Sequence, residues 1–346
     1  MSGFKEDVSE HIAAVYQTVM DEVKGWISLL KEIWPLLFLL FFGLCILLWL
    51  AKPAPPKKVL MATGTGGSYK VLGEKYQSYF KQKGIDLELI PTHGSQENLQ
   101  HLIDRKDPIQ AALVQGGMIA VENLSGVESL GSIDFEPVWV FYRHKLYDEK
   151  SHILDRDITK LKINLGPQGS GTRKQAENIL KLNNLPMNSP NLLALSNADG
   201  VAALERGEID AIILVDGYDS VNVQKLIRNP QIHLANFGRA NAYTRLMPYF
   251  EELTVPMGGF DLGQNIPDHP IQLISTTTNL LIDDRLHPAI QALFLEAAKE
   301  INGKKSYFAK AGQFPSYLNT EAPLSGEAKY YYQNGMPPLM KYLPFW

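Results

Sequence analysis

Two glycine-rich segments of the same design, VLMATGTGGSYKVLGEKYQSYF at 59–80 and KINLGPQGSGTRKQAENILKL at 162–182, determine how this chain is expected to fold. Each segment is an apolar strand-like run, then a Gly/Ser/Thr loop, then an amphipathic helix pattern. A loop of this kind at a helix start presents unpaired backbone N–H groups and hydroxyls to one point in space. Two such loops that face each other across a cleft could hold an anion from both sides.

Strand and helix patterns alternate from residue 59 onward. The expected strands are 59–62, 87–90, 110–114, 138–142, 162–165, 211–215 and 272–275, and the expected helices are 68–81, 96–104, 172–182, 199–206 and 288–301. This alternation predicts an α/β fold with mostly parallel sheets. Roughly 290 residues are many for one sheet and suit two lobes. We place lobe 1 at about 59–140 and 270–346, and lobe 2 at about 141–269.

The composition is that of an ordinary globular protein and excludes several classes of site. Of the 346 residues, 45% are hydrophobic and 20% are charged, with a net charge of −4. This slight acidity, without a long Lys/Arg run, argues against a nucleic-acid partner. The single cysteine, Cys45, excludes an intrachain disulfide and a cysteine-based metal site. The eight histidines show no metal-ligand spacing, so we expect neither a metal nor a cofactor.

An uncharged apolar stretch separates a short N-terminal segment from the globular part. Residues 33–51, with Trp34 and Trp49 near their ends, are long enough to cross a bilayer as a helix. A buried core helix and a cleaved signal peptide are the alternatives. Residues 1–32 have the periodicity of an amphipathic juxtamembrane helix, which could instead bind a partner or a second copy. Residues 52–58, rich in Pro and Lys, form a semi-rigid linker.

The first glycine loop, residues 63–70, does not satisfy either nucleotide-binding fingerprint. A phosphate loop needs Gly-Lys followed by Ser or Thr, and the dinucleotide pattern fails because Tyr69 stands where its last glycine belongs. What remains is Ser68 as a helix cap, beside glycines that let a ligand approach the backbone. A plain strand–helix turn is the alternative.

The second glycine loop repeats this chemistry and adds an arginine. Ser170 and Thr172 are candidate caps, and Arg173 follows directly. Backbone N–H groups, hydroxyls and a guanidinium fork together could hold a carboxylate. The alternative for Arg173 is a solvated residue in the first helical turn.

Further candidate ligand contacts follow other predicted strands. Thr92, Ser95 and Gln115 stand at strand ends, where open α/β sheets bind their ligands. Tyr69 is expected either to stack on a solute or to pack within its helix, and Asp216 could contact an amine of the ligand. The chain has no G-x-S-x-G elbow and no evident histidine partner for its loop serines. We therefore expect no catalytic residues and no enzyme.

Several segments together resemble one known family over about residues 59–311. They are ATGTGGSY, PTHGSQENLQHL, AALVQGGM, NLGPQGSGTRKQAENIL, LSNADGVAALERGEIDAIILV, LIRNPQIHLANFGRANAY and STTTNLLIDDRLHPAIQALFLEAA. In their order and spacing the chain resembles the TAXI-type solute receptors of TRAP transporters. The resemblance implies a type II periplasmic-binding-protein fold, with two α/β lobes, a hinge and a solute in the cleft between them.

The resemblance also implies which residues line that cleft. They are Thr65, Ser68, Tyr69, the loop from Thr92 to Ser95, Gln115, Ser170, Thr172 and Arg173. Family members deliver small organic acids or glutamate-like compounds to an ion-driven permease. Typical receptors diffuse freely or carry a lipid anchor, whereas this chain is expected to be tethered, and its tail at 330–346 ends aromatic and apolar.

Charge alone does not settle the orientation of the apolar stretch. Lys24 and Lys31 precede it, and Lys52, Lys57 and Lys58 follow it, which leans slightly toward a cytoplasmic globular part. The resemblance implies the opposite, a globular part outside the cytoplasm on a single-pass inner-membrane anchor.

These inferences give one expected function. The chain should be a membrane-anchored, extracytoplasmic solute-binding subunit that captures a small carboxylate for a TRAP-type permease. The alternative is a membrane-tethered solute sensor or interaction protein that uses the same domain.

Overall fold

The computed structural model describes residues 3–50, 55–118, 124–143, 160–318 and 321–336. The chain divides into two compact units, Met1–Ala54 and Pro55–Trp346. Residues 52–54 of the expected linker at 52–58 lie outside the described residues. So do residues 337–346 of the expected aromatic tail at 330–346.

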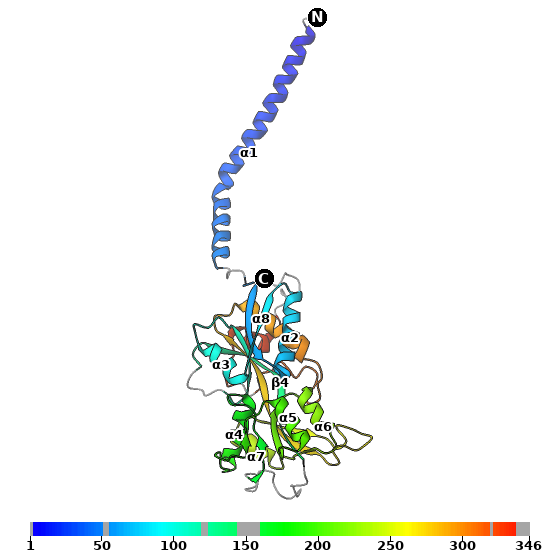
Figure 1. The fold of residues 1–346 in the computed structure, drawn as a ribbon. Coiled ribbons are helices and arrows are strands. Elements are labelled where there is room, and N and C mark those ends of the chain that lie inside the picture. The colour runs from blue at the N-terminus through cyan, green and yellow to red at the C-terminus, as the bar shows by residue number, and fades with distance from the viewer. Residues whose placement is uncertain (1–2, 51–54, 119–123, 144–159, 319–320, 337–346) are drawn as a thin grey trace. The chain divides into compact units, whose positions relative to one another are not determined.

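The N-terminal unit is a single helix, α1 (Gly3–Leu50), of 48 residues. The described parts of the segments expected separately at 1–32 and 33–51 are therefore one continuous element. Pro35 lies inside this helix, which changes direction partway along its length (Figure 1). Its stretch Tyr16–Leu47 is long and apolar enough to cross a membrane, and its described side chains are exposed within the unit. This exposed apolar surface needs a nonaqueous or protein environment.

The globular unit is built on a mixed sheet of ten strands. The strand order is β2-β1-β3-β10-β4-β7-β5-β6, with β8 paired to β4 and β9 paired to β10. In chain order the strands are β1 (Lys58–Gly64), β2 (Asp86–Thr92), β3 (Ala111–Gln115), β4 (Val127–Tyr142), β5 (Ile163–Asn164), β6 (Leu192–Leu193), β7 (Ala211–Val215), β8 (His233–Leu234), β9 (Glu251–Val255) and β10 (Ile271–Asp283).

Two long antiparallel strands connect the halves of this sheet. β4 pairs with β10 from Val127 to Pro137, and then with β7 from Val138 to Tyr142. We call β1, β2 and β3, with the first part of β4 and its β10 partner, the first half-sheet. The second half-sheet is β5, β6 and β7 with the last part of β4. The lobe boundaries at 59–140, 141–269 and 270–346 stay a prediction.

The expectation of mostly parallel sheets was wrong. β1 is parallel to β2 and β3, and β5 is parallel to β6 and β7, but β10 and β4 are antiparallel to all their partners. The sequence pattern did not predict β4 and β10 at their full length, because the middles of these strands are polar. Ser132, Thr277 and Asn279 are fully buried there and hydrogen bond to one another, since two neighbouring strands supply their partners.

Helices cover both half-sheets (Figure 1). The first half-sheet packs against α2 (Gly67–Gln82), α3 (Ser95–Ile103), α8 (Pro288–Asn302) and α9 (Gly326–Asn334); the second carries α4 (Gly171–Leu182), α5 (Asn197–Arg206), α6 (Val221–Ile227) and α7 (Ala240–Leu246). The five helices and seven strands expected from sequence are all present in whole or in part, whereas α6, α7 and α9 were missed. Separate apolar cores form around Phe80 and Phe294 in the first half and around Trp139 and Ile212 in the second.

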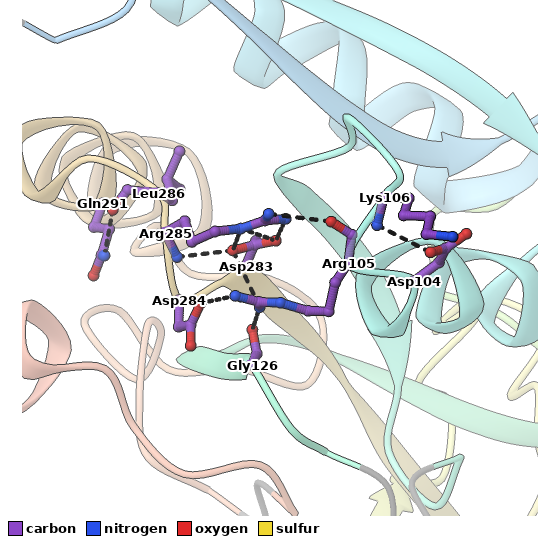
Figure 2. A network of polar contacts seen from close by, with 9 residues as sticks. All are labelled: Asp104, Arg105, Lys106, Gly126, Asp283, Asp284, Arg285, Leu286 and Gln291. Atoms are coloured by element: carbon purple, nitrogen blue, oxygen red, sulfur yellow. Dashed lines mark hydrogen bonds and ion pairs between the residues drawn. The ribbon is translucent and has the colours of Figure 1, made fainter.

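A network of two arginines fixes the end of β10 (Figure 2). Arg285 donates from Nη2 to Oδ2 of the buried Asp283 at 2.5 Å, and Arg105 contacts Oδ1 of Asp283 at 3.4 Å. Arg105 also donates to the Gly126 carbonyl and to Asp284. Burial alone would raise the pKa of Asp283, but hydrogen bonds from Arg285 and the charge of Arg105 outweigh burial and lower it.

Candidate functional site

Four helices begin at the carboxyl ends of strands and converge on one cavity. α2 follows β1, α3 follows β2, α4 follows β5 and α5 follows β6. The cavity has a volume of about 400 Å³. The first N–H groups of each helix lack intrahelical partners, so the cavity wall is rich in backbone donors. The two glycine loops singled out in the sequence therefore do meet at one place.

Most of the expected site residues line this cavity. Its wall consists of Gly64, Thr65, Gly66, Gly67, Ser68, Tyr69, Thr92, His93, Gly94, Ser95, Gln115, Glu136, Pro167, Ser170, Gly171, Thr172, Ser196, Asn197, Ala198, Val215, Asp216 and Asn222. Nine of the ten candidates are in this set, and Arg173 is not. The site assignments themselves stay predictions about ligand contact.

The start of α2 is capped from the other half of the sheet. Ser68 does not cap the helix as expected; the cap position is Gly66, which offers no side chain. Instead the backbone N–H of Ser68 donates to Oδ1 of Asp216 at 3.2 Å. Asp216 directly follows β7, and its carboxylate also accepts from the Gly217 N–H and the Ser220 hydroxyl. The side chain expected to contact a ligand amine thus occupies the anion position at α2.

Gly67 makes this approach possible. Its φ of +68° is a conformation that favours glycine, and a Cβ there would meet Oδ2 of Asp216 at 3.2 Å. A side chain at this position would therefore push against Asp216, whose hydrogen bond with Ser68 joins α2 to the end of β7.

The start of α4 matches its sequence pattern, except for the arginine. Ser170 is the N-cap and accepts the Arg173 N–H at 3.1 Å. The buried Thr172 hydroxyl lies against the backbone of Val215 on β7. The Arg173 guanidinium donates to Glu177 at 2.8 Å and to the Leu193 carbonyl at 3.0 Å. These bonds hold α4 against β6, and Arg173 is not among the residues of the cavity wall.

A buried polar chain runs from α2 to β4 along the floor of the cavity. The Tyr69 hydroxyl lies 3.0 Å from Oγ of Ser95, which accepts the Gln115 N–H. Nε2 of Gln115 donates to Oε2 of Glu136 at 2.9 Å, and the Thr278 hydroxyl donates to Oε1. Tyr69 is therefore packed and also lines the cavity, and its stacking on a solute stays a prediction.

Glu136 is a candidate functional residue that sequence reasoning missed. It is 3% exposed, and burial first, with a contribution from the nearby Asp216 and Asp134 charges, raises its pKa to about 8. Perturbed carboxyls in a cavity mark candidate functional sites. A signal was present in the sequence, since Glu136 is an acid inside the apolar run FEPVWVFY at 135–142.

The charged side chains of the cavity wall are acidic. Among the wall residues that the structure describes, Glu136 and Asp216 carry carboxyls, His93 and Tyr69 are the other titratable groups, and none is Lys or Arg. Across the described ranges, no group of three or more His, Cys, Asp or Glu residues could hold a metal ion.

Contacts inside the cleft join the two half-sheets. Nε2 of Gln175 on α4 donates to the Gly116 carbonyl beyond β3 at 2.8 Å. Gly171 lies so close to Gln115 that a Cβ would meet Oε1 at 2.2 Å. Together with the Ser68–Asp216 bond, these contacts bring the walls of the cavity together from opposite halves.

Comparison with known proteins places the globular unit in a family. No curated protein matches the chain significantly. Solved structures with a similar fold include a protein of Bordetella bronchiseptica RB50, at 16% identity over 73% of this chain and 74% of that one, with a TM-score of 0.46. The regulatory domain of CcmR from Synechocystis PCC6803, solved in complex with 2-PG, has 16% identity over 71% of this chain and 97% of its own, with a TM-score of 0.45.

A periplasmic binding protein of Salmonella typhimurium, described as having high arginine specificity, is also similar. It shares 10% identity over 73% of this chain and 96% of its own, with a TM-score of 0.42. The NMT1-like family matches residues 60–333, which run from β1 to α9 and include every wall residue of the cavity. The chain belongs to the NMT1-like family.

Proposed function

We propose that this protein is a membrane-tethered, extracytoplasmic solute-binding subunit that captures a small amino-acid-like compound for a TRAP-type permease. The observation that carries the proposal is the cavity between the half-sheets, into which four helix starts point. A volume of about 400 Å³ suits a small solute.

The carboxylate of the solute would lie at the starts of α3, α4 and α5. Their backbone N–H groups and partial positive charge favour an anion. The start of α2 is not available in the same way, because Asp216 already accepts its N–H group. Recognition would therefore rest on Ser95, on the Ser170–Thr172 turn and on the turn at Asn197.

Release and capture require the cavity walls to separate. The half-sheets are joined by β4 and β10, so we propose that these strands carry the hinge and that solute contacts from both halves favour the closed state. No cofactor or catalytic group is required for this role.

The binding site can be tested on the full-length protein in detergent with a matched pair of glycine variants. Gly171 and Gly326 each stand directly after a serine N-cap, at the first residue of α4 and α9. A Cβ at Gly171 would collide with Gln115, whereas a Cβ at Gly326 would meet nothing within 4 Å. A thermal-shift screen of amino acids and organic acids first identifies solutes that raise the melting temperature.

We expect Gly171→Ala to weaken binding of those solutes by about tenfold or more, a loss of about 1.4 kcal/mol, because Gln115 must leave its position. Gly326→Ala should bind like the wild type. Equal loss of binding in both variants, or in neither, would contradict the placement of the site.

The orientation is tested separately in cells. Protease added to intact spheroplasts should digest the globular unit, because the proposal places it outside the cytoplasm. Protection until the cells are lysed would overturn the extracytoplasmic location and, with it, the transport role.

A further inference from the structure

The charge of the cavity points to a feature of the solute that a carboxylate alone does not have. Asp216 is 5% exposed, and its carboxylate accepts three hydrogen bonds from the chain itself, at Ser68, Gly217 and Ser220. This carboxylate lies beside the cavity, and none of the wall residues that the structure describes is Lys or Arg. A solute carboxylate at the start of α2 would meet this charge at close range.

Glu136, on the floor of the cavity, also favours a positive charge on the solute. Its hydrogen-bond partners Gln115, Thr278 and Tyr69 are all neutral. The charged groups that act on it are Asp216, from the end of β7, and Asp134, from its own strand, and both are acidic. A positive charge from outside the chain would therefore favour the ionised form of Glu136.

Two unpartnered acceptors on the wall are an independent sign of a missing donor. Oε1 of Gln115, a residue that is 2% exposed, has no hydrogen-bond partner, and neither has the buried Oδ1 of Asn197. Both residues line the cavity, one from each half. Buried acceptors without donors are costly, and Oε1 of Gln115 lies against Gly171 of the opposite wall, so a solute N–H group that reached either acceptor would be favoured.

We propose that the solute must carry a cationic nitrogen, a protonated amine or a guanidinium, which lies against Asp216 and Glu136. Carboxylic acids that lack this group fit the cavity but are not its ligands. This inference rests on the proposed solute-binding function and narrows it to cationic and zwitterionic solutes, excluding simple organic acids.

Binding should also be linked to protons. Burial raises the pKa of Glu136 to about 8, so at pH 7 the empty site holds it mostly protonated. A cation against it favours the ionised form, so its arrival expels a proton. Affinity for a cationic solute should therefore rise as the pH increases from 6 to 8, whereas affinity for a plain carboxylate would fall.

The test uses pairs of solutes that differ only in the amine: glutamate and glutarate, alanine and propionate, phenylalanine and 3-phenylpropionate. Putrescine and agmatine serve as cations without a carboxylate. Calorimetry on the full-length protein in detergent, at pH 6, 7 and 8, gives affinities and the number of protons released. We expect the amine to improve affinity by about tenfold or more within the pair that binds.

Matched variants assign the effect to the acidic residues. Asp216→Asn keeps an oxygen for the Ser68 N–H while removing the charge, and should reduce the amine's advantage by about tenfold. Glu136→Gln should abolish proton release and reduce the pH dependence. Asp219→Asn changes an exposed aspartate three residues beyond Asp216 and should behave like the wild type.

The outcomes separate this inference from the function on which it rests. If the desamino partners bind as well as the amino compounds, or affinity falls as the pH rises, the cationic requirement is wrong while solute binding stands. If no compound in the pairs or in the wider screen binds, the proposed function fails and the inference fails with it. Retention of the amine's advantage in both Asp216→Asn and Glu136→Gln would also overturn it.

Discussion

Glu136 and Asp283 are both 3% exposed and lie on the same pair of long strands, but their surroundings are opposite. Asp283 ends β10 and is held by Arg285 and Arg105 (Figure 2), which lower its pKa. Glu136 lies on β4 beside neutral partners and other acids, which leave its pKa raised to about 8.

The difference separates a carboxyl that the chain itself compensates from one that, in our proposal, a bound solute compensates. The arginines around Asp283 supply the charge and hydrogen bonds that burial removes, so this network stabilises the fold without any added molecule. At Glu136, burial disfavours the ionised carboxylate, and no arginine or lysine in the described wall offsets this. Two acids of equal burial can therefore have unrelated roles, and the charges around them reveal which is which.

The largest effect on the stability of the protein should come from removing the carboxyl of Glu136. An unfolded glutamate ionises near about pH 4.3, whereas Glu136 in the folded state does so at about 8. Between these values the folded state binds more protons than the unfolded state, so stability is highest below this window and falls as the pH rises through it. Glu136→Gln should remove this loss, on the order of 5 kcal/mol at pH 8.

Urea unfolding of the wild type and Glu136→Gln at pH 5 and pH 8 measures this effect. The matched control is Glu252→Gln, an exposed glutamate on β9, which should leave the pH dependence unchanged. If Glu136→Gln shows the same decline with pH as the wild type, Glu136 is ionised at neutral pH and the contrast with Asp283 fails.

The compensated carboxyl should respond with the opposite sign. Asp283→Asn should destabilise the protein at pH 7 by about 2 kcal/mol, because Arg285 and Arg105 lose a charged acceptor and are themselves partly exposed. Since the pKa of Asp283 is lowered by folding, its contribution is present above the unfolded value of about 3.9 and is lost as the pH falls below it.

Thermal unfolding at pH 7 and pH 3 should therefore show a large difference between wild type and Asp283→Asn at the higher pH and a small one at the lower. Asp284→Asn, which removes a neighbouring carboxylate that is 42% exposed, should cost less than about 0.5 kcal/mol. Equal effects of the two variants would show that burial of Asp283 does not matter.

A pair of glycines tests how closely the arginine network is packed. Gly126 and Gly312 both have positive φ, at +83° and +76°, so alanine is strained at each. A Cβ at Gly126 would also lie 1.9 Å from Nη1 of Arg105, whereas one at Gly312 would meet nothing within 4 Å. Gly126→Ala should be less stable than Gly312→Ala by about 1 kcal/mol. Chemical denaturation measures both, and equal stabilities would mean that Arg105 moves without cost.

The smallest effect on binding should come from Arg173→Ala. Its side chain is 11% exposed and is engaged by Glu177 and the Leu193 carbonyl, away from the cavity. We expect a destabilisation of about 1 kcal/mol, with solute affinity within about threefold of the wild type, or 0.7 kcal/mol. Calorimetry with the solute that the screen identifies checks this, and loss of binding in a variant that remains folded would return Arg173 to the site.

The sequence predicted the parts of the fold whose signals are local. The buried run Ala211–Val215 was expected at its observed bounds, and α4 within one residue, because an apolar run and a serine cap each define an element without distant information. The first half of β4 and the second half of β10 were missed. Their buried polar residues satisfy one another only after the two strands have paired.

The site was predictable as a set of loops but not as a set of charges. The capping loops identified most of the cavity wall, since helix starts at strand ends meet at one edge of a sheet. Arg173 stands two residues after Gly171, about 200° around the helix, so it points away from the wall that Gly171 forms. Glu136 could not be assigned, because only the folded structure shows which charges surround it.

The pairing of β4 with β10 limits how the globular unit can move. The two strands pair from Val127 opposite Asp283 to Pro137 opposite Ser275, with register shifts after Thr278 and after Leu280, and each contributes apolar residues to both cores. Sliding one strand along the other would break every bond of this ladder at once, whereas a rotation of the strand ends about their long axis breaks few. We therefore expect the globular unit to move by twisting of β4 and β10 and not by sliding of one strand along the other. The amides in the middle of this ladder should be among the slowest to exchange with deuterium, whether the cavity is empty or filled.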